Sequence, residues 1–181
     1  MEQQQFQQQL SLSKTISDLR NKKEIKCLLI LYAQNAESVN AIHLANIYGA
    51  LADGVGDVEK LKIDDRFKML LKSTIDKLQS TSECFDVRGL ATITHSLGKL
   101  KIFDERFFSE IVKLRKRIAK EGEPQHLSNI VWAFATVGFG SEELFDAVAG
   151  EHGRIVASGN AQDLSNLCWA FATLGWQNKL I

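Results

Sequence analysis

The apolar side chains recur at helical spacing along most of the chain. Within LSNIVWAFATVG, Leu127, Ile130 and Phe134 follow one another at three- and four-residue steps, so they share one face of a helix. Similar spacing begins near Ser13, the alternating β-branched runs typical of strands are missing, and Pro124 is the single proline. The pattern predicts an all-α protein.

One helical pattern occurs twice almost letter for letter, as LSNIVWAFATVG at residues 127–138 and LSNLCWAFATLG at residues 164–175. LANIYGALA and GLATITHSLGKL, earlier in the chain, fit the same register with less similarity. Spacings of 46, 37 and 37 residues separate the aligned leucines, which are Leu44, Leu90, Leu127 and Leu164. A period of 37–38 residues predicts helix–loop–helix repeats stacked into a right-handed α-solenoid.

The repeats divide the chain into a lead-in, a cap and four units, the last of which holds only its first helix. Residues 1–11 are Gln-rich with few apolar side chains, so we expect a flexible segment there. The remaining segments are two capping helices over 12–37, repeat 1 over 38–80, repeat 2 over 81–120, repeat 3 over 121–158, and incomplete repeat 4 over 159–181. Because the last helix lacks its partner, we expect further chain or an interface to cover Leu167, Phe171 and Leu174.

Acidic and hydroxyl side chains precede the expected second helices. Asp64 and Ser141 are N-cap candidates, and the neighbouring acids suit the positive end of a helix dipole. The three cysteines, Cys27, Cys84 and Cys168, lie within apolar patterns far from one another, so we expect buried, reduced thiols without disulfides.

A second face of the repeated helix is polar and aligned between repeats. In repeat 3 it carries Asn129, Trp132 and Thr136, and the equivalent positions elsewhere are Asn46, Gly49 and Asp53, then Thr92, His95 and Lys99, then Asn166, Trp169 and Thr173. Amides, hydroxyls and flat rings in such a row suit hydrogen bonding to, and stacking on, the bases of single-stranded RNA. The alternative is structural: the asparagines bridge adjacent repeats, and the tryptophans are wedged between helices, which we favour for the tryptophans.

Charge is unevenly distributed although its net value is zero. Lys and Arg outnumber Asp and Glu up to residue 120, and acids dominate afterwards. A cluster in repeat 2 comprises Lys113, Arg115, Lys116, Arg117 and Lys120, and a second lies at Arg20, Lys22, Lys23 and Lys26. These clusters are candidates for phosphate contact, with a solvated helix face as the alternative.

Catalytic and metal-binding patterns are missing from the sequence. The histidines at 43, 95, 126 and 152 lack the HxxxH or Cys/His spacing of zinc sites, and the glycines at 54 and 56 lack the context of a phosphate-binding loop. The longest apolar run, CLLILYA, is too short to span a membrane. We therefore expect no enzymatic activity, cofactor, metal, small-molecule substrate or membrane insertion.

The two copies of the motif, LSNIVWAFATVG and LSNLCWAFATLG, resemble the octotricopeptide and heptatricopeptide-type repeats of organellar RNA-associated proteins, the RAP-domain and FAST kinase-like class. LANIYGALA and the preceding KEIKCLLILYAQNAESVNAIHLANI are similar to the opening of such arrays, so the resemblance covers residues 14–175. It implies binding of single-stranded RNA in a mitochondrion or plastid, in support of transcript stability, processing, translation or ribosome assembly. No RAP domain occurs within these residues.

The leading hypothesis is therefore a non-catalytic repeat module that binds single-stranded RNA in a reducing organellar compartment. The candidate RNA-binding residues are Asn46, Thr92, His95, Lys99, Asn129, Thr136, Asn166, Thr173, Lys113, Arg115, Lys116 and Arg117. The alternative hypothesis is a protein-interaction scaffold, such as a structural subunit of an organellar ribosome or membrane complex, which the zero net charge favours.

Overall fold

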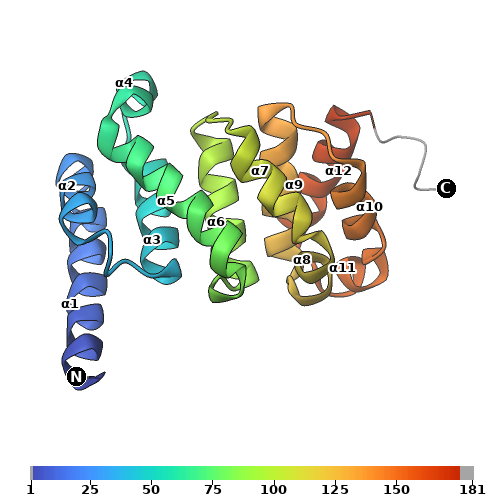
Figure 1. Ribbon diagram of the computed structural model, residues 1–181. Coiled ribbons are helices and arrows are strands. Elements are labelled where there is room, and N and C mark those ends of the chain that lie inside the picture. The colour runs from blue at the N-terminus through green and yellow to red at the C-terminus, as the bar shows by residue number, and fades with distance from the viewer. Residues whose placement is uncertain (1, 176–181) are drawn as a thin grey trace. The chain divides into compact units, whose positions relative to one another are not determined.

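The structure is a computed structural model that describes residues 2–175 (Figure 1). These residues form twelve α-helices and one 3-10 helix and no strand, which confirms the all-α prediction. The chain divides into two compact units, Met1–Phe85 and Asp86–Ile181.

The first unit pairs its N-terminal helices with those of the first repeat. Helix α1 packs on α3, and α2 packs on both α3 and α5. The elements are α1 (Glu2–Asn21), α2 (Ile25–Asn35), α3 (Ala41–Gly54), α4 (Val58–Ile63), α5 (Asp65–Thr81) and the 3-10 helix η1 (Ser82–Cys84). The short helix α4 lies in the loop that makes the first spacing longer than the others.

The Gln-rich start, which we expected to be a flexible lead-in, is helical from Glu2 onward. Its side chains hold the start of the first repeat: Gln9 Nε2 donates to the Ser38 carbonyl oxygen at 2.7 Å, and Asn40 Nδ2 donates to Gln9 Oε1 at 2.9 Å. Composition alone missed this because the glutamines make polar contacts with a segment about 30 residues away.

The second unit contains a row of first helices with shorter second helices beside it (Figure 1). Helices α6 and α9 lie side by side, and so do α9 and α12, while α8 packs on α10. The elements are α6 (Val87–Lys99), α7 (Glu105–Lys113), α8 (Arg115–Glu121), α9 (Pro124–Val137), α10 (Glu142–Ala149), α11 (His152–Ser158) and α12 (Ala161–Thr173). The expected second helix of repeats 2 and 3 is thus broken into two, at Leu114 and at Gly150.

The N-caps of the first helices keep the register of the repeat. Asp86 and Asn160 accept backbone hydrogen bonds from the residues three positions later, Gly89 and Asp163, at 2.7 and 2.9 Å. The four N-cap residues, Asn40, Asp86, Glu123 and Asn160, are separated by the same 46, 37 and 37 residues as the aligned leucines. Each repeat therefore begins its first helix at the same point.

Second helices are capped as the sequence predicts. Asp64 accepts from the Arg66 backbone N–H at 2.9 Å, and Ser141 Oγ accepts from the Leu144 N–H at 3.4 Å. Hydrogen bonding from the Arg66 side chain lowers the pKa of Asp64 to about 2. In repeat 2, the carboxylate of Asp104 likewise accepts hydrogen bonds from Nε and Nη2 of Arg106. The local structure therefore repeats along with the sequence.

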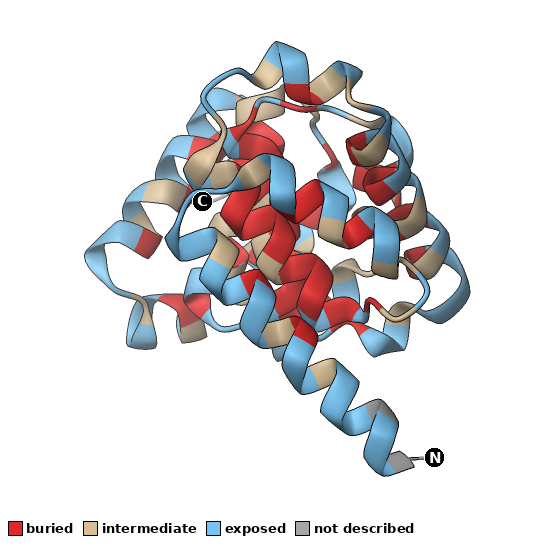
Figure 2. Cartoon of the chain, turned by 90° about the vertical axis from the view of Figure 1, so that its left-hand side faces the viewer, coloured by how far each residue is buried: buried red, intermediate tan, exposed pale blue. Residues whose placement is uncertain are grey.

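Aromatic contacts repeat with the same period in the core between the helices, where the buried positions gather (Figure 2). The rings of Phe108 and Phe134 meet edge to face with centroids 4.9 Å apart, and those of Phe145 and Phe171 do so at 5.0 Å. Leu167 and Phe171, which we expected to be exposed without further cover, are only 8% and 7% exposed. The preceding repeat already covers them.

The cysteines differ from their prediction, since Cys27, Cys84 and Cys168 are all exposed. In α2, the neighbouring Leu28 and Leu29 occupy the buried face instead. A cysteine is small enough to fit either side of an amphipathic helix, and the apolar pattern around it did not decide between them.

Candidate functional site

One side of the second unit's first helices remains accessible to solvent. We call it the open stripe, and it comprises Thr92, His95 and Lys99 on α6, Asn129, Trp132 and Thr136 on α9, and Asn166, Trp169 and Thr173 on α12. The apolar side chains on the opposite face of each helix are buried, as Leu90, Ile93 and Leu97 are in α6. Because α6, α9 and α12 pack side by side, the aligned sequence positions become neighbouring positions on one surface.

The middle positions of the open stripe form a continuous row of rings. His95 and Trp132 have ring centroids 4.9 Å apart, and Trp132 and Trp169 are 6.3 Å apart. The tryptophans do contact their neighbours in adjacent repeats, but Trp132 is only half-buried and Trp169 is 45% exposed. The row is therefore a surface stack of rings, which offers flat faces and edges to a ligand.

The polar side chains that flank the rings differ in whether they already make hydrogen bonds within the protein. Thr92 Oγ1 donates to the Arg88 carbonyl oxygen at 2.9 Å, and Thr136 Oγ1 donates to the Trp132 carbonyl oxygen at 2.8 Å. Asn166 Oδ1 accepts from Gln162 Nε2 at 2.8 Å. The Asn129 side chain makes no hydrogen bond within residues 2–175 and is half-buried, so its amide can serve a ligand.

A polar notch of about 400 Å³ opens between the N-terminal halves of α6 and α9. The residues that line it are Arg88, Ala91, Thr92, Glu123, Gln125, His126 and Asn129. His126 Nδ1 accepts from the Glu123 backbone N–H at 3.2 Å, so the proton of the neutral ring is on Nε2. The notch thus joins a guanidinium, a carboxylate, two amides and an imidazole N–H, a set that can donate hydrogen bonds to, and accept them from, the polar edges of a ligand.

The first repeat has no equivalent ring row. Gly49 is buried in α3, and Arg20 Nη2 of α1 binds Asp53 Oδ2 at 2.7 Å. Asn46 is half-buried in α3, within the first unit. The first repeat therefore presents an amide beside an ion pair where the second unit presents rings.

The basic cluster of repeat 2 lies on α7 and α8, outside the open stripe. Lys113 Nζ pairs with Glu110 Oε1 at 2.8 Å, and Arg115 Nη1 donates to the Val112 carbonyl oxygen at 3.3 Å. Hydrogen bonds from its own backbone and from Ser141, with a smaller contribution from Arg115, lower the pKa of Glu143 on α10. Lys116 and Arg117 lie on the same helix, α8, so the structure does not bring these four basic residues to the ring row.

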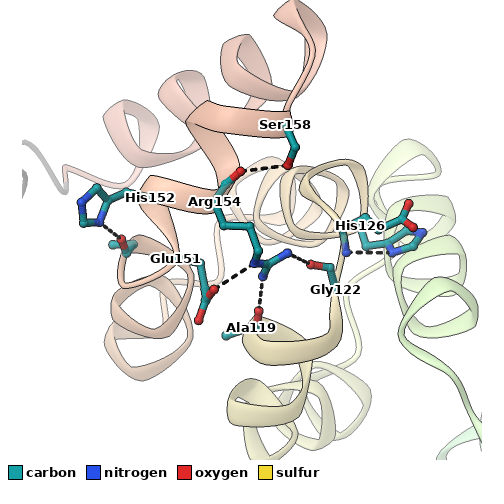
Figure 3. A network of polar contacts seen from close by, with 9 residues as sticks. Ala119, Gly122, His126, Glu151, His152, Arg154 and Ser158 are labelled. Carbon is teal, nitrogen blue, oxygen red and sulfur yellow. Dashed lines mark hydrogen bonds and ion pairs between the residues drawn. The ribbon is translucent and has the colours of Figure 1, made fainter.

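The sequence analysis did not identify the notch residues Arg88, Gln125 and His126. It also did not identify Arg154, whose side chain joins two helices. Arg154 Nη1 donates to the Gly122 carbonyl oxygen at 2.6 Å, Nη2 donates to that of Ala119 at 2.5 Å, and Nε pairs with Glu151 at 3.0 Å (Figure 3). These bonds join α11 to the C-terminal end of α8. The notch residues could have been found because they lie one or two turns before the aligned row, whereas nothing local marks Arg154.

Among residues 2–175, no group of three or more His, Cys, Asp or Glu side chains is arranged to hold a metal ion. No helix in that range is both long and apolar enough to cross a membrane. Compared with known protein families and with curated proteins, the chain matches none.

Proposed function

We propose that this chain is a non-catalytic helical-repeat module, a right-handed α-solenoid, that binds single-stranded RNA along the open stripe. The observation that carries the proposal is the row of rings His95, Trp132 and Trp169, flanked on the same face by amides and hydroxyls. Unpaired bases stack on such rings, and their edges exchange hydrogen bonds with amides.

The notch supports the same proposal, because its residues can make hydrogen bonds to a nucleotide whereas the rings can stack on one. Arg88 lies in the notch one turn from Thr92, and Asn129 faces it from the next helix. A nucleotide placed there would meet amide and carboxylate groups for the edge of its base and the Arg88 guanidinium for a phosphate, while the ring row begins one turn further along. We therefore propose the open stripe and the notch, rather than the α8 cluster, as the RNA-binding surface.

The test is the affinity of the whole chain for fluorescently labelled 15-nucleotide single-stranded RNA, measured by anisotropy at several salt concentrations. Replacing Asn129 and Asn166 together with Ala should weaken binding about tenfold or more, because each lost hydrogen bond to a base contributes on the order of 1 kcal/mol. Both side chains are accessible, so the fold should be unchanged. A matched variant, Lys116→Ala with Lys120→Ala on α8, should change the affinity less than about threefold.

Two outcomes would count against the proposal. Equal affinities of the wild type and the Asn129/Asn166 variant would remove the asparagines from base contact. Binding that does not weaken with salt would exclude phosphate contacts, since each one should contribute about −0.7 to the logarithmic salt slope for a single strand.

The second candidate function is a protein scaffold in a larger organellar complex. Zero net charge and the paired state of Lys113 favour it, because a surface that attracts RNA usually carries unpaired positive charge. The organellar setting of both proposals comes from the resemblance of the repeats. Failure to bind any single-stranded RNA at low salt would favour the scaffold.

A further inference from the structure

One polar contact between neighbouring first helices is missing at the notch. Between α9 and α12, Oγ of the buried Ser128 donates to Oδ1 of the buried Asp163 at 3.3 Å. The residues 37 positions earlier are Ala91 and His126, which both line the notch between α6 and α9. Because alanine has no polar side-chain atom, the equivalent contact cannot form there.

His126 therefore keeps a hydrogen-bond donor that its counterpart in the first repeat uses. His43 and His126 each accept the backbone N–H of their N-cap residue at Nδ1, at 3.3 and 3.2 Å. Nε2 of His43 then lies 2.8 Å from Ser13 Oγ, whereas Nε2 of His126 makes no hydrogen bond within residues 2–175. The ring of His126 is half-buried, so its N–H is available to a ligand in the notch.

The notch also holds two opposite charges that do not pair. The guanidinium of Arg88 on α6 and the carboxylate of Glu123 at the start of α9 are both exposed and line the same notch. In the part of the chain that the structure describes, neither side chain makes an ion pair. The notch therefore offers a carboxylate that can accept and a guanidinium that can donate.

This combination fits guanine better than the other bases. Guanine presents two adjacent donors, N1–H and the N2 amino group, which match the two oxygens of a carboxylate. Its O6 and N7 accept hydrogen bonds from a guanidinium. Adenine and cytosine present an unprotonated ring nitrogen beside their amino group, and uracil presents its one N–H between two carbonyl oxygens, so each would set an acceptor against the carboxylate.

We propose that the notch selects guanine, with Glu123 accepting from N1–H and the N2 amino group while Arg88 and His126 donate to O6 and N7. The inference rests on the proposed RNA binding and adds selectivity for one base to it. The ring row stacks on any base, so the preference comes from the notch.

The probes are five labelled 15-nucleotide RNAs, each an oligouridine with guanine, inosine, adenine, cytosine or uracil at its centre. Their affinities for the full chain are measured by anisotropy at one salt concentration. The guanine RNA should bind about tenfold more tightly than the adenine, cytosine and uracil RNAs, because a paired set of hydrogen bonds to a base edge contributes this much discrimination. Inosine lacks the N2 amino group and should lose most of the gain.

A variant assigns the preference to the notch. Glu123→Gln replaces the acceptor pair with one acceptor and one donor, so it should reduce the ratio of guanine to uracil affinity from about tenfold to less than about twofold. The ratio is the readout because a change in net charge affects both RNAs equally. Glu105→Gln, at an exposed position in the first turn of α7, makes the same charge change and should keep the ratio.

The outcomes separate this inference from the function on which it rests. Equal affinities for the five RNAs would overturn guanine selection and leave RNA binding standing. A guanine preference that survives Glu123→Gln, with the fold verified by circular dichroism, would overturn the assignment to the notch. Absence of binding to every RNA at low salt would overturn both.

Discussion

At the scale of single residues, Gly98 shows how closely two first helices approach. A Cβ atom built on Gly98 would lie 2.8 Å from both Cα and Cβ of Ala133. The helices α6 and α9 can touch there only because neither residue has a longer side chain. This contact keeps the rings of His95 and Trp132 on neighbouring helices within reach of each other.

Gly98→Ala should therefore destabilise the protein by about 1–3 kcal/mol, because the added methyl group forces two backbones apart. The gain in helix propensity, about 1 kcal/mol, offsets only part of this cost. Gly153→Ala in α11 is the matched control, since a Cβ atom there meets nothing within 4 Å, and it should leave stability unchanged or raised. Urea denaturation of both variants checks the prediction, and equal stabilities would contradict the close approach.

Because His43 is buried in the first unit, we expect the free energy of unfolding to depend on pH. Its side chain is buried, its Nε2 lies 2.8 Å from Ser13 Oγ, and burial lowers its pKa below the usual 6.5, partly opposed by a hydrogen bond to the Gln9 carbonyl oxygen. Since the unfolded chain binds the proton more readily, the stabilisation is complete above about pH 6.5. It is lost as the pH falls from there through the lowered pKa.

Urea unfolding of the wild type and of His43→Gln between pH 5 and 7.5 measures this effect. Gln can still accept the N-cap hydrogen bond but does not titrate, so the variant should lose less stability on acidification than the wild type. Parallel pH profiles of the two proteins would show that His43 is not the titrating group.

At the scale of elements, the sequence predicted the first helices well and the second helices less well. Leucines and N-caps recur with the same spacing, so periodicity placed α3, α6, α9 and α12. The glycines at 150 and 153 are expected to weaken the second helix of repeat 3, and the structure breaks that helix at Gly150. The break at Leu114 was not expected, because the apolar spacing continues across it. A local pattern records which face is buried but does not record a change of helix direction.

The sequence likewise predicted one part of the candidate site and missed another. Periodicity aligned Asn129, Trp132 and their equivalents, but their neighbours across the helices became visible only in the structure. Arg88 and His126 meet in the notch from different repeats, each about one turn before the aligned row, so the period brings them to the same region but does not by itself mark them as a site. The contacts of Arg154 with Ala119 and Gly122 also span more than 30 residues.

Arg154 joins α11 to α8 through two backbone carbonyls, so Arg154→Lys should destabilise the protein by about 1–3 kcal/mol. Lysine presents a single ammonium group and cannot donate to both carbonyls in the fork geometry of a guanidinium. Arg106→Lys is the control, since Arg106 forks with Asp104 at the start of its own helix and is exposed, which limits its effect to less than about 1 kcal/mol. Thermal and urea unfolding measure the stabilities of the two variants. Equal losses of stability would argue against a stabilising role for the hydrogen bonds of Arg154 to the two carbonyls.

At the scale of the whole molecule, the alignment of repeats gathers the rings and polar groups of three helices on one surface of the second unit, the open stripe. The division of the chain at Phe85 was not expected from the sequence, which placed a repeat boundary at residues 80 and 81. The period in the sequence treats all repeats as equivalent. The boundary between compact units depends instead on which helices pack most closely, and the period does not contain that information.

The most direct test of the central claim is photo-crosslinking of the full chain to single-stranded RNA containing 4-thiouridine, with the crosslinked peptides mapped by mass spectrometry. Aromatic side chains that stack on bases lie close enough to react, so crosslinks should map to α6, α9 and α12, at or next to His95, Trp132 and Trp169. Crosslinks confined to α8 and its basic residues, or to the first unit alone, would contradict the assignment of the open stripe as the RNA-binding surface.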